Sequence, residues 1–159
     1  MNEKKEEPIA EQIFVPVYHF KVAFIANDSS APIELAFRDV TGLNIELQTE
    51  EVRSGGENMM VYRLPKPIKY ANLKLSRALS GAEELDEITH WAEQAIYHMK
   101  IELKTVQVSL LNEKHEAVRV WSFIGAYPVK LNVSDMNASK NEISIETLEL
   151  AYKYARRDK

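Results

Sequence analysis

The chain of 159 residues contains no cysteine, which removes two common ways of stabilising a small domain. Disulfides staple many small secreted domains, and structural zinc sites usually need thiolate ligands. We therefore expect packing, backbone pairing or partner subunits to hold this fold together. The length is sufficient for one domain with a substantial core, whereas two domains would each be short.

Long apolar runs and an excess of basic residues are also missing. No stretch approaches the ~20 apolar residues of a membrane-spanning helix. The first residues, MNEKKEEP, are charged, and no apolar stretch resembling a signal peptide follows them. We therefore expect no membrane span and a protein that is made in the cytoplasm. The formal net charge of −4 argues against a nucleic-acid binder that works through a basic footprint.

The motifs of common enzyme active sites are absent from the sequence. There is no Gly-x-Ser-x-Gly elbow and no phosphate loop that ends in Gly-Lys-Ser/Thr. Glu87 and His90 share a helical face, but a di-iron site needs two such pairs and two further carboxylates. We interpret this pair as an exposed helix face. We expect no enzyme activity, no catalytic residue, no metal and no cofactor.

Two weaker signals have both a functional and a structural interpretation. Gly55 and Gly56 can form an anion-binding nest, although a glycine pair is more typical of a sharply turned loop. Glu142 and Glu146 resemble the paired carboxylates of a glycosidase. Two such positions on one strand face more often point to solvent or to a partner's basic residue. We expect both to be strand residues at a subunit interface or in the core.

Aromatic residues offer a third alternative, a ligand cavity. Trp91, Trp121 and Phe123 are the candidates for its lining. Aromatic side chains in a small β domain belong more often to the core or to an interface. We expect Trp121 and Phe123 to be core or subunit-interface residues.

The dominant pattern in the sequence is the alternation of apolar and polar residues, which is typical of half-buried strands. Phe20, Val22 and Phe24, for example, alternate with Lys21 and Ala23. Glycine and polar residues predict a loop over residues 53–58. Further strands are expected near residue 34 and at 43–48, 59–63, 70–79, 105–110, 118–124, 129–133 and 142–154.

A single helix is predicted at about residues 82–99, after a capping box formed by Ser80 and Glu83. Its apolar residues recur at helical spacing: Leu85, Ile88, Ala92, Ala95 and Met99. Residues 1–11 are polar and predict a flexible arm, followed by one domain over residues 12–159. The fold class is mainly β (α+β), with two packed antiparallel sheets or a small β-barrel and one α-helix.

Seven segments in order resemble the phage tail tube family, which contractile phage tails share with phage-tail-like extracellular injection systems. Their order and spacing are specific, although no single piece is diagnostic. The segments are FKVAF at 20–24, FRDVTGL at 37–43, EEVRSGGEN at 50–58, RLP at 63–65, KYANLKLSRAL at 69–79, VWSFIGAYPVK at 120–130 and NASKNEISIETLEL at 137–150.

The resemblance implies a structural subunit of an inner tube. Six copies would close into a ring, strands of neighbouring copies would join into a barrel around a lumen, and rings would stack into a tube. The implied partners are further copies of the chain, a sheath protein, baseplate and tube-cap proteins, and cargo or DNA in the lumen. The subunit would be incorporated into a phage tail or an extracellular particle. The resemblance also places a ring-stacking loop at Arg53, Gly55, Gly56, Glu57 and Asn58.

Two alternatives remain open at this point. The first is a baseplate tube initiator or adaptor of the same machine. The second is a small-ligand-binding β-barrel, and an enzyme with an unrecognised site ranks below it.

Overall fold

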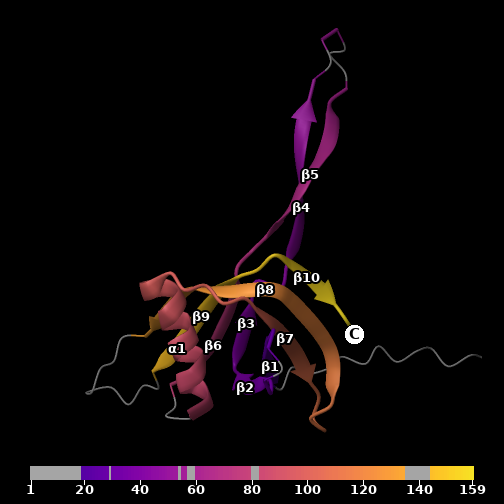
Figure 1. The fold of residues 1–159 in the computed structure, drawn as a ribbon. Helices are drawn as coiled ribbons and strands as arrows, with labels where there is room; N and C mark the ends of the chain where they lie inside the picture. Colours follow the sequence, from indigo (N-terminus) through magenta and orange to yellow (C-terminus); the bar gives the residue numbers. More distant parts are fainter. Residues whose placement is uncertain (1–18, 29, 54, 57–59, 80–82, 135–143) are drawn as a thin grey trace, which may run out of the picture.

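A computed structural model describes most of the chain after residue 18 (Figure 1). The described residues are 19–28, 30–53, 55–56, 60–79, 83–134 and 144–159. The arm expected at residues 1–11 lies outside them, as do Ser80 and Glu142. The elements are β1 (His19–Ala26), β2 (Ile33–Phe37), β3 (Asp39–Thr41), β4 (Ile45–Val52), β5 (Tyr62–Tyr70), β6 (Leu73–Ala78), α1 (Glu83–His98), β7 (Lys104–Leu111), β8 (Ala117–Val133), β9 (Ile145–Ala151) and β10 (Tyr154–Arg157).

The body of the molecule is a small antiparallel barrel. Its strands follow the order β2-β1-β7-β8-β9-β6-β3, so β2 and β3 form the two ends of the sheet. Only Arg38 separates these two strands in the chain, and its backbone N–H donates to the Ser76 carbonyl at 3.0 Å. One chain segment therefore pairs with β1 on one side and with β6 on the other. The sheet closes on itself, and the predicted mainly β fold is confirmed.

The long strand β8 replaces two strands that the sequence predicted at 118–124 and 129–133. Its first part pairs with β7 and β10, and its second part pairs with β9. Gly125 lies at the changeover with a φ of +65°, a backbone conformation that glycine adopts without steric cost. The prediction of a break was wrong because this glycine bends the strand without ending it.

The structure also corrects the strand boundaries that were predicted around β5. The sequence predicted strands at 59–63 and 70–79, separated by Leu64–Pro67. The structure instead has one strand through both prolines and a second strand at Leu73–Ala78. Prolines are tolerated there because β5 pairs only with β4, so its other edge needs no backbone donor. The ladder is irregular between Leu47 and Thr49, opposite Lys66 and Pro67.

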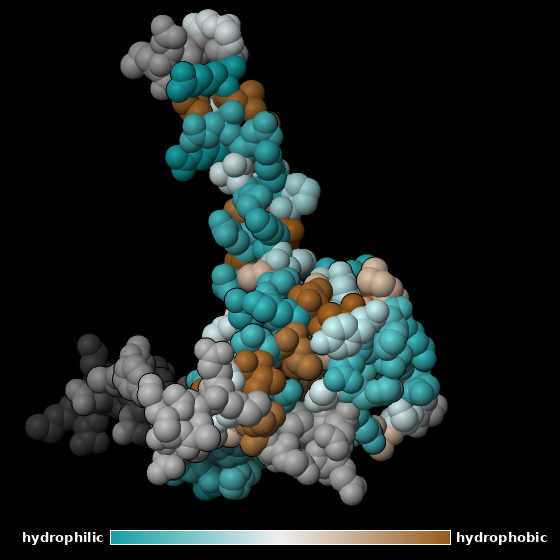
Figure 2. All heavy atoms as spheres, turned by 90° about the vertical axis from the view of Figure 1, so that its left-hand side faces the viewer, coloured by the Kyte–Doolittle hydropathy of each residue, from teal (hydrophilic) through white to brown (hydrophobic). Residues whose placement is uncertain are grey.

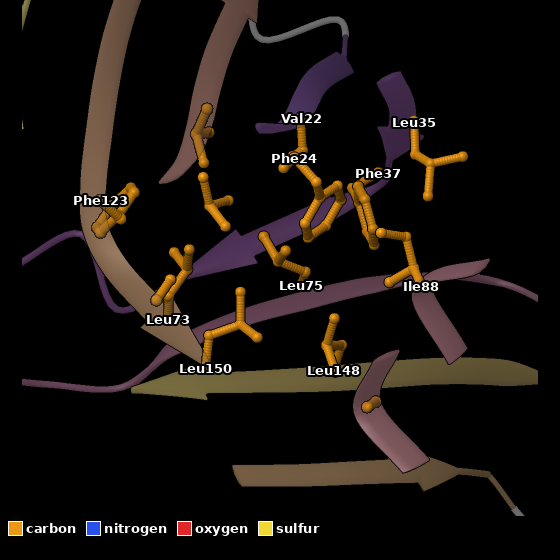
Figure 3. Close-up of a cluster of buried hydrophobic side chains, with 14 of the residues drawn as sticks. Val22, Phe24, Leu35, Phe37, Leu73, Leu75, Ile88, Phe123, Leu148 and Leu150 are labelled. Atoms are coloured by element: carbon orange, nitrogen blue, oxygen red, sulfur yellow. The ribbon is translucent and has the colours of Figure 1, made fainter. Parts of the chain in front are cut away.

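The core fills the barrel and continues under α1 (Figure 3). Phe24 and Phe37 lie close together inside the barrel, and Ile88 reaches them from the helix (Figure 3). Trp91 packs edge-on against Phe24 at 6.1 Å between ring centroids, and its Nε1 donates to the Glu102 carbonyl at 2.9 Å. The structure therefore gives Trp91 a core role.

The helix buries three of the five residues of its predicted face, whereas Met99 is exposed and the side chain of Leu85 lies outside the described residues. Ile88, Ala92 and Ala95 are buried, and Glu87 is exposed. Met99 was expected to continue the buried face, but it is 77% exposed. The helix ends at His98, and Met99 has a φ of +54°, a conformation typical of the residue after a helix. No helix in the described part of the chain is both long and apolar enough to cross a membrane.

Candidate functional site

The strands β4 and β5 form a hairpin that projects from the barrel (Figure 1). They make up a separate two-stranded sheet, and every residue of β4 is exposed. The alternation of Leu43, Ile45 and Leu47 predicted a half-buried strand. The strand is present, but within one subunit Ile45 and Leu47 have no layer to cover them. An isolated two-stranded hairpin is at best marginally stable in water.

The apolar side chains of the hairpin form two patches. The root patch lies near the barrel and consists of the pairs Ile45–Tyr70 and Leu47–Ile68. Ile45, Leu47 and Ile68 are 59%, 57% and 48% exposed, respectively. These pairs share one face, because directly opposed residues of an antiparallel ladder point the same way. Figure 2 shows apolar atoms at intervals along the projection, between polar ones.

The tip patch lies on the other face of the hairpin. Val52 opposes Tyr62, and Leu64 opposes Glu50. These β4 positions are even-numbered, whereas those of the root patch are odd-numbered, and neighbouring strand residues point to opposite faces. All three apolar side chains of the tip patch are exposed. The hairpin thus presents apolar surface on one face at its root and on the other face towards its tip.

The ion pairs of the hairpin hold its two strands together only weakly. Arg63 lies 3.4 Å from Glu51, and Lys66 lies 3.2 Å from Glu50. All four side chains are exposed, and such pairs typically contribute about 0–1 kcal/mol. The hairpin therefore gains little stability from its own charges, and burial against another surface would stabilise it more.

The predicted loop lies at the end of the hairpin, between β4 and β5. Arg53, Gly55 and Gly56 are exposed, and Gly56 has a φ of +118°. A Cβ atom at either glycine would meet no heavy atom within 4 Å. Glu57 and Asn58 lie outside the described residues.

The aromatic candidates lie in the barrel wall, far along the chain from the hairpin. Phe123 is fully buried and packs edge-on against Tyr152, with 4.9 Å between ring centroids. Trp121 is half-buried and packs against the same core. Tyr152 also contacts Tyr70 at the base of the hairpin, at 5.4 Å. These aromatic rings connect the root of the hairpin to the core.

Glu146 is the one buried carboxylate of the described barrel, at 6% exposed. It lines a small hollow beneath α1 together with Ile88 and Leu131, and it lies opposite Arg77 in the β6–β9 ladder. Burial raises the pKa of the Glu146 carboxyl, and the positive charge of Arg77 lowers it by a smaller amount. Glu146 is therefore buried between the sheet and α1 and is not exposed to solvent.

The variant Glu146→Gln is expected to be more stable than the parent protein at neutral pH. A raised folded-state pKa means that the folded chain binds this proton more tightly than the unfolded chain does. The protonated Glu146 carboxyl therefore stabilises the fold at low pH. This stabilisation is lost as the pH rises from the pKa of the carboxyl in the unfolded chain to its higher pKa in the folded chain. Glutamine is neutral throughout. Thermal midpoints of both proteins should differ by a few degrees at about pH 8 and converge near pH 4. A lower midpoint for the variant at neutral pH would show that attraction to Arg77 outweighs the cost of burial.

The sequence and the fold together identify the family. The model of the T4-like virus tail tube protein gp19 family matches residues 16–156, nearly the whole chain. The chain belongs to the T4-like tail tube protein family. It is a tail tube subunit, of a phage tail or of a contractile injection particle, and the family is structural rather than enzymatic. The resemblance inferred from the seven sequence segments is confirmed. No curated protein matches the sequence.

Solved structures of tube components support this assignment. A chain of the anti-feeding prophage baseplate, solved with six-fold symmetry, is 30% identical with a TM-score of 0.79; the match covers 89% of this chain and 94% of that one. A chain of the sheath–tube complex of the extracellular contractile injection system PVC, in its extended state, is 26% identical with a TM-score of 0.74. That match covers 94% of this chain and 95% of the other.

A more distant likeness concerns the fold alone. The crystal structure of an Hcp protein matches with a TM-score of 0.55 at 10% identity, over 87% of this chain and 91% of that one. The fold of this chain is therefore also found in a protein of very different sequence.

Proposed function

We propose that this tail tube protein forms six-membered rings that stack into the inner tube of a contractile particle, with the β4–β5 hairpin bridging neighbouring copies. The observation that carries the proposal is the hairpin, which projects from the barrel with two apolar patches that the subunit leaves exposed. Exposed apolar surface rimmed by polar residues is typical of protein interfaces. The partner is a second copy of the chain, because each subunit of a tube contacts other copies of the same protein.

Closure of a head-to-tail contact is the physical reason to expect a ring. A head-to-tail contact uses two different surfaces of each subunit, and it ends in a ring when the rotation between neighbours closes. The six-fold symmetry of the related anti-feeding prophage baseplate supports this number. In the ring we expect each root patch to be covered by the adjacent copy.

The tip of the hairpin is proposed to make the contact between stacked rings. Arg53 supplies a charge there, and Gly55 and Gly56 permit a tight excursion of the backbone. Glu57 and Asn58 complete the proposed stacking loop with an opposite charge and an amide. The loop's position at the far end of the hairpin supports this role, since it reaches farther from the barrel than any other described turn (Figure 1).

The remaining partners follow from the related particles. One related chain comes from a sheath–tube complex, and another at 25% identity comes from a sheath–tube terminator. We therefore propose a sheath around the tube, a baseplate below it, a terminating cap above it, and cargo or DNA in the lumen. The subunit would be made in the cytoplasm and incorporated into a phage tail or an extracellular phage-tail-like particle.

A baseplate tube initiator or adaptor is the second candidate. The observation that favours it is the 30% identity to a chain of a baseplate structure, against 26% to a chain of a sheath–tube complex. An initiator starts the tube without continuing it, so it would form single rings and no long polymers.

Electron microscopy of the purified full-length protein tests the proposal. We expect six-fold rings, and tubes of many stacked rings at high protein concentration. Single rings at every concentration would favour the initiator. Monomers at every concentration, confirmed by light scattering, would overturn the assembly of this chain by itself.

A further inference from the structure

Two of the four histidines meet at the surface of the barrel, although 96 residues separate them in the chain. His19 begins β1, and His115 lies in the turn between β7 and β8. The His115 Nδ1 and His19 Nε2 atoms are 3.2 Å apart, and the two rings are tilted by 53° with centroids 5.0 Å apart. The turn between β7 and β8, which carries His115, lies at the end of the barrel away from the hairpin (Figure 1).

Both imidazoles are held by ordered backbone. His19 pairs with Leu111 in the β1–β7 ladder. The Asn112 side-chain oxygen accepts the backbone N–H groups of Lys114 and Glu116, each at 2.9 Å, and the Asn112 carbonyl accepts that of His115 at 3.0 Å. These bonds hold the backbone of the turn that carries His115.

The backbone of His115 has a φ of +59°, a left-handed conformation that non-glycine residues adopt uncommonly. Histidine is, with asparagine and aspartate, among the non-glycine residues most often found in this region, so the turn accommodates His115.

We propose that His19 and His115 bind a divalent transition-metal ion of the zinc class through the two facing nitrogens. Zinc binds imidazole nitrogen at about 2.0–2.1 Å, which places two nitrogens of a tetrahedral site about 3.3 Å apart. The observed separation of 3.2 Å matches that span without movement of the backbone. Metal-free rings at this distance share one N–H···N hydrogen bond, which the ion replaces with two stronger bonds.

The surroundings leave the other coordination positions open. The hollow beside the pair is lined by His19, His115, Leu111 and the ion pair of Lys21 and Glu34, whose charged atoms are 3.1 Å apart. In the described part of the chain, no cluster of three or more potential ligands (His, Cys, Asp or Glu) is found. The chain therefore offers two protein ligands here, and water would fill the remaining positions around a bound ion.

Zinc titration of the full-length protein by calorimetry at neutral pH tests the site. Parent protein is expected to bind one Zn²⁺ per chain. Changing a residue that merely orients a ligand weakens metal binding about 10–100-fold, so removing a ligand should weaken it at least tenfold. His19→Gln and His115→Asn are the informative variants, because asparagine tolerates the left-handed turn while lacking the imidazole.

The chain offers its own control, since the other two histidines lie on or at the end of α1. His90→Ala/His98→Ala retains only the proposed pair and should bind zinc as the parent does. Circular dichroism confirms that each variant is folded. Undiminished binding by both single variants, loss of binding in the helix double variant, or no binding by the parent would each overturn the site. The outcome does not depend on whether the protein forms rings.

Discussion

The double variant Leu47→Asp/Ile68→Asp is expected to fold but to form no tubes. These side chains oppose each other in the root patch, and both are about half exposed. The hairpin lies outside the barrel core, so the thermal midpoint should change by only a few degrees. A penalty of only ~1.4 kcal/mol per contact weakens association tenfold, and repetition around a ring multiplies that loss. Electron microscopy and sedimentation at high protein concentration measure the outcome.

A matched control lies on the opposite face of the same stretch of hairpin. Glu46 opposes Lys69, so Glu46→Ser/Lys69→Ser changes an equally exposed pair without touching the root patch. This control should retain assembly.

The variant Arg53→Glu tests the proposed contact between stacked rings separately from the proposed contact within a ring. It should still form single rings but no long tubes. Tubes of normal length from the Leu47→Asp/Ile68→Asp variant would contradict the proposed role of the hairpin.

Gly42→Ala is expected to cause the largest loss of stability among single substitutions outside the core. Gly42 follows β3, where the chain leaves the barrel for the hairpin, and its φ is +90°. An added Cβ atom would lie 2.1 Å from the Asn72 carbonyl oxygen, far inside contact distance. Because that neighbour is backbone, relief requires the two chain segments to move apart. We expect a loss of more than about 3 kcal/mol, or about 10 °C in thermal midpoint.

Gly55→Ala is the control for Gly42→Ala, because a Cβ atom there meets no heavy atom within 4 Å. Its effect on stability should stay within about 0.5 kcal/mol. Thermal unfolding of both variants followed by circular dichroism gives the comparison. Equal midpoints for the two would show that the chain at Gly42 relaxes easily and that the hairpin is loosely anchored.

The sequence predicted the barrel well because its strands carry an apolar face of period two. Val22 and Phe24, for instance, are both in the core. The helix was found because Ile88, Ala92 and Ala95 recur at its period. The strand boundaries that were predicted wrongly lie at glycine and proline residues. A break was expected between residues 124 and 129, where Gly125 instead bends one continuous strand. The segment Leu64–Pro67 was expected to separate two strands, but its prolines lie in β5, which has a free edge.

The projection of the hairpin and the contact between the two histidines could not be predicted from the sequence, for different reasons. Ile45 and Leu47 alternate like residues of a half-buried strand, and a pattern does not tell whether the covering layer comes from the same chain or from another. His19 and His115 carry no local motif, since only the pairing of β1 with β7 brings them together.

The closure of the barrel through the β2–β3 segment determines when a newly made chain can fold. β1 pairs with β7, which lies about eighty residues downstream, and β6 pairs with β9, which is nearly the last strand to leave the ribosome. Loop-closure entropy must be overcome before such distant pairings become favourable. The nascent chain cannot complete its barrel until residue 151 has emerged, whereas β4 and β5 adjoin each other and can pair early. The two strands of the hairpin can therefore meet on the ribosome before the barrel is complete, and their apolar side chains are then exposed while the chain is still being made.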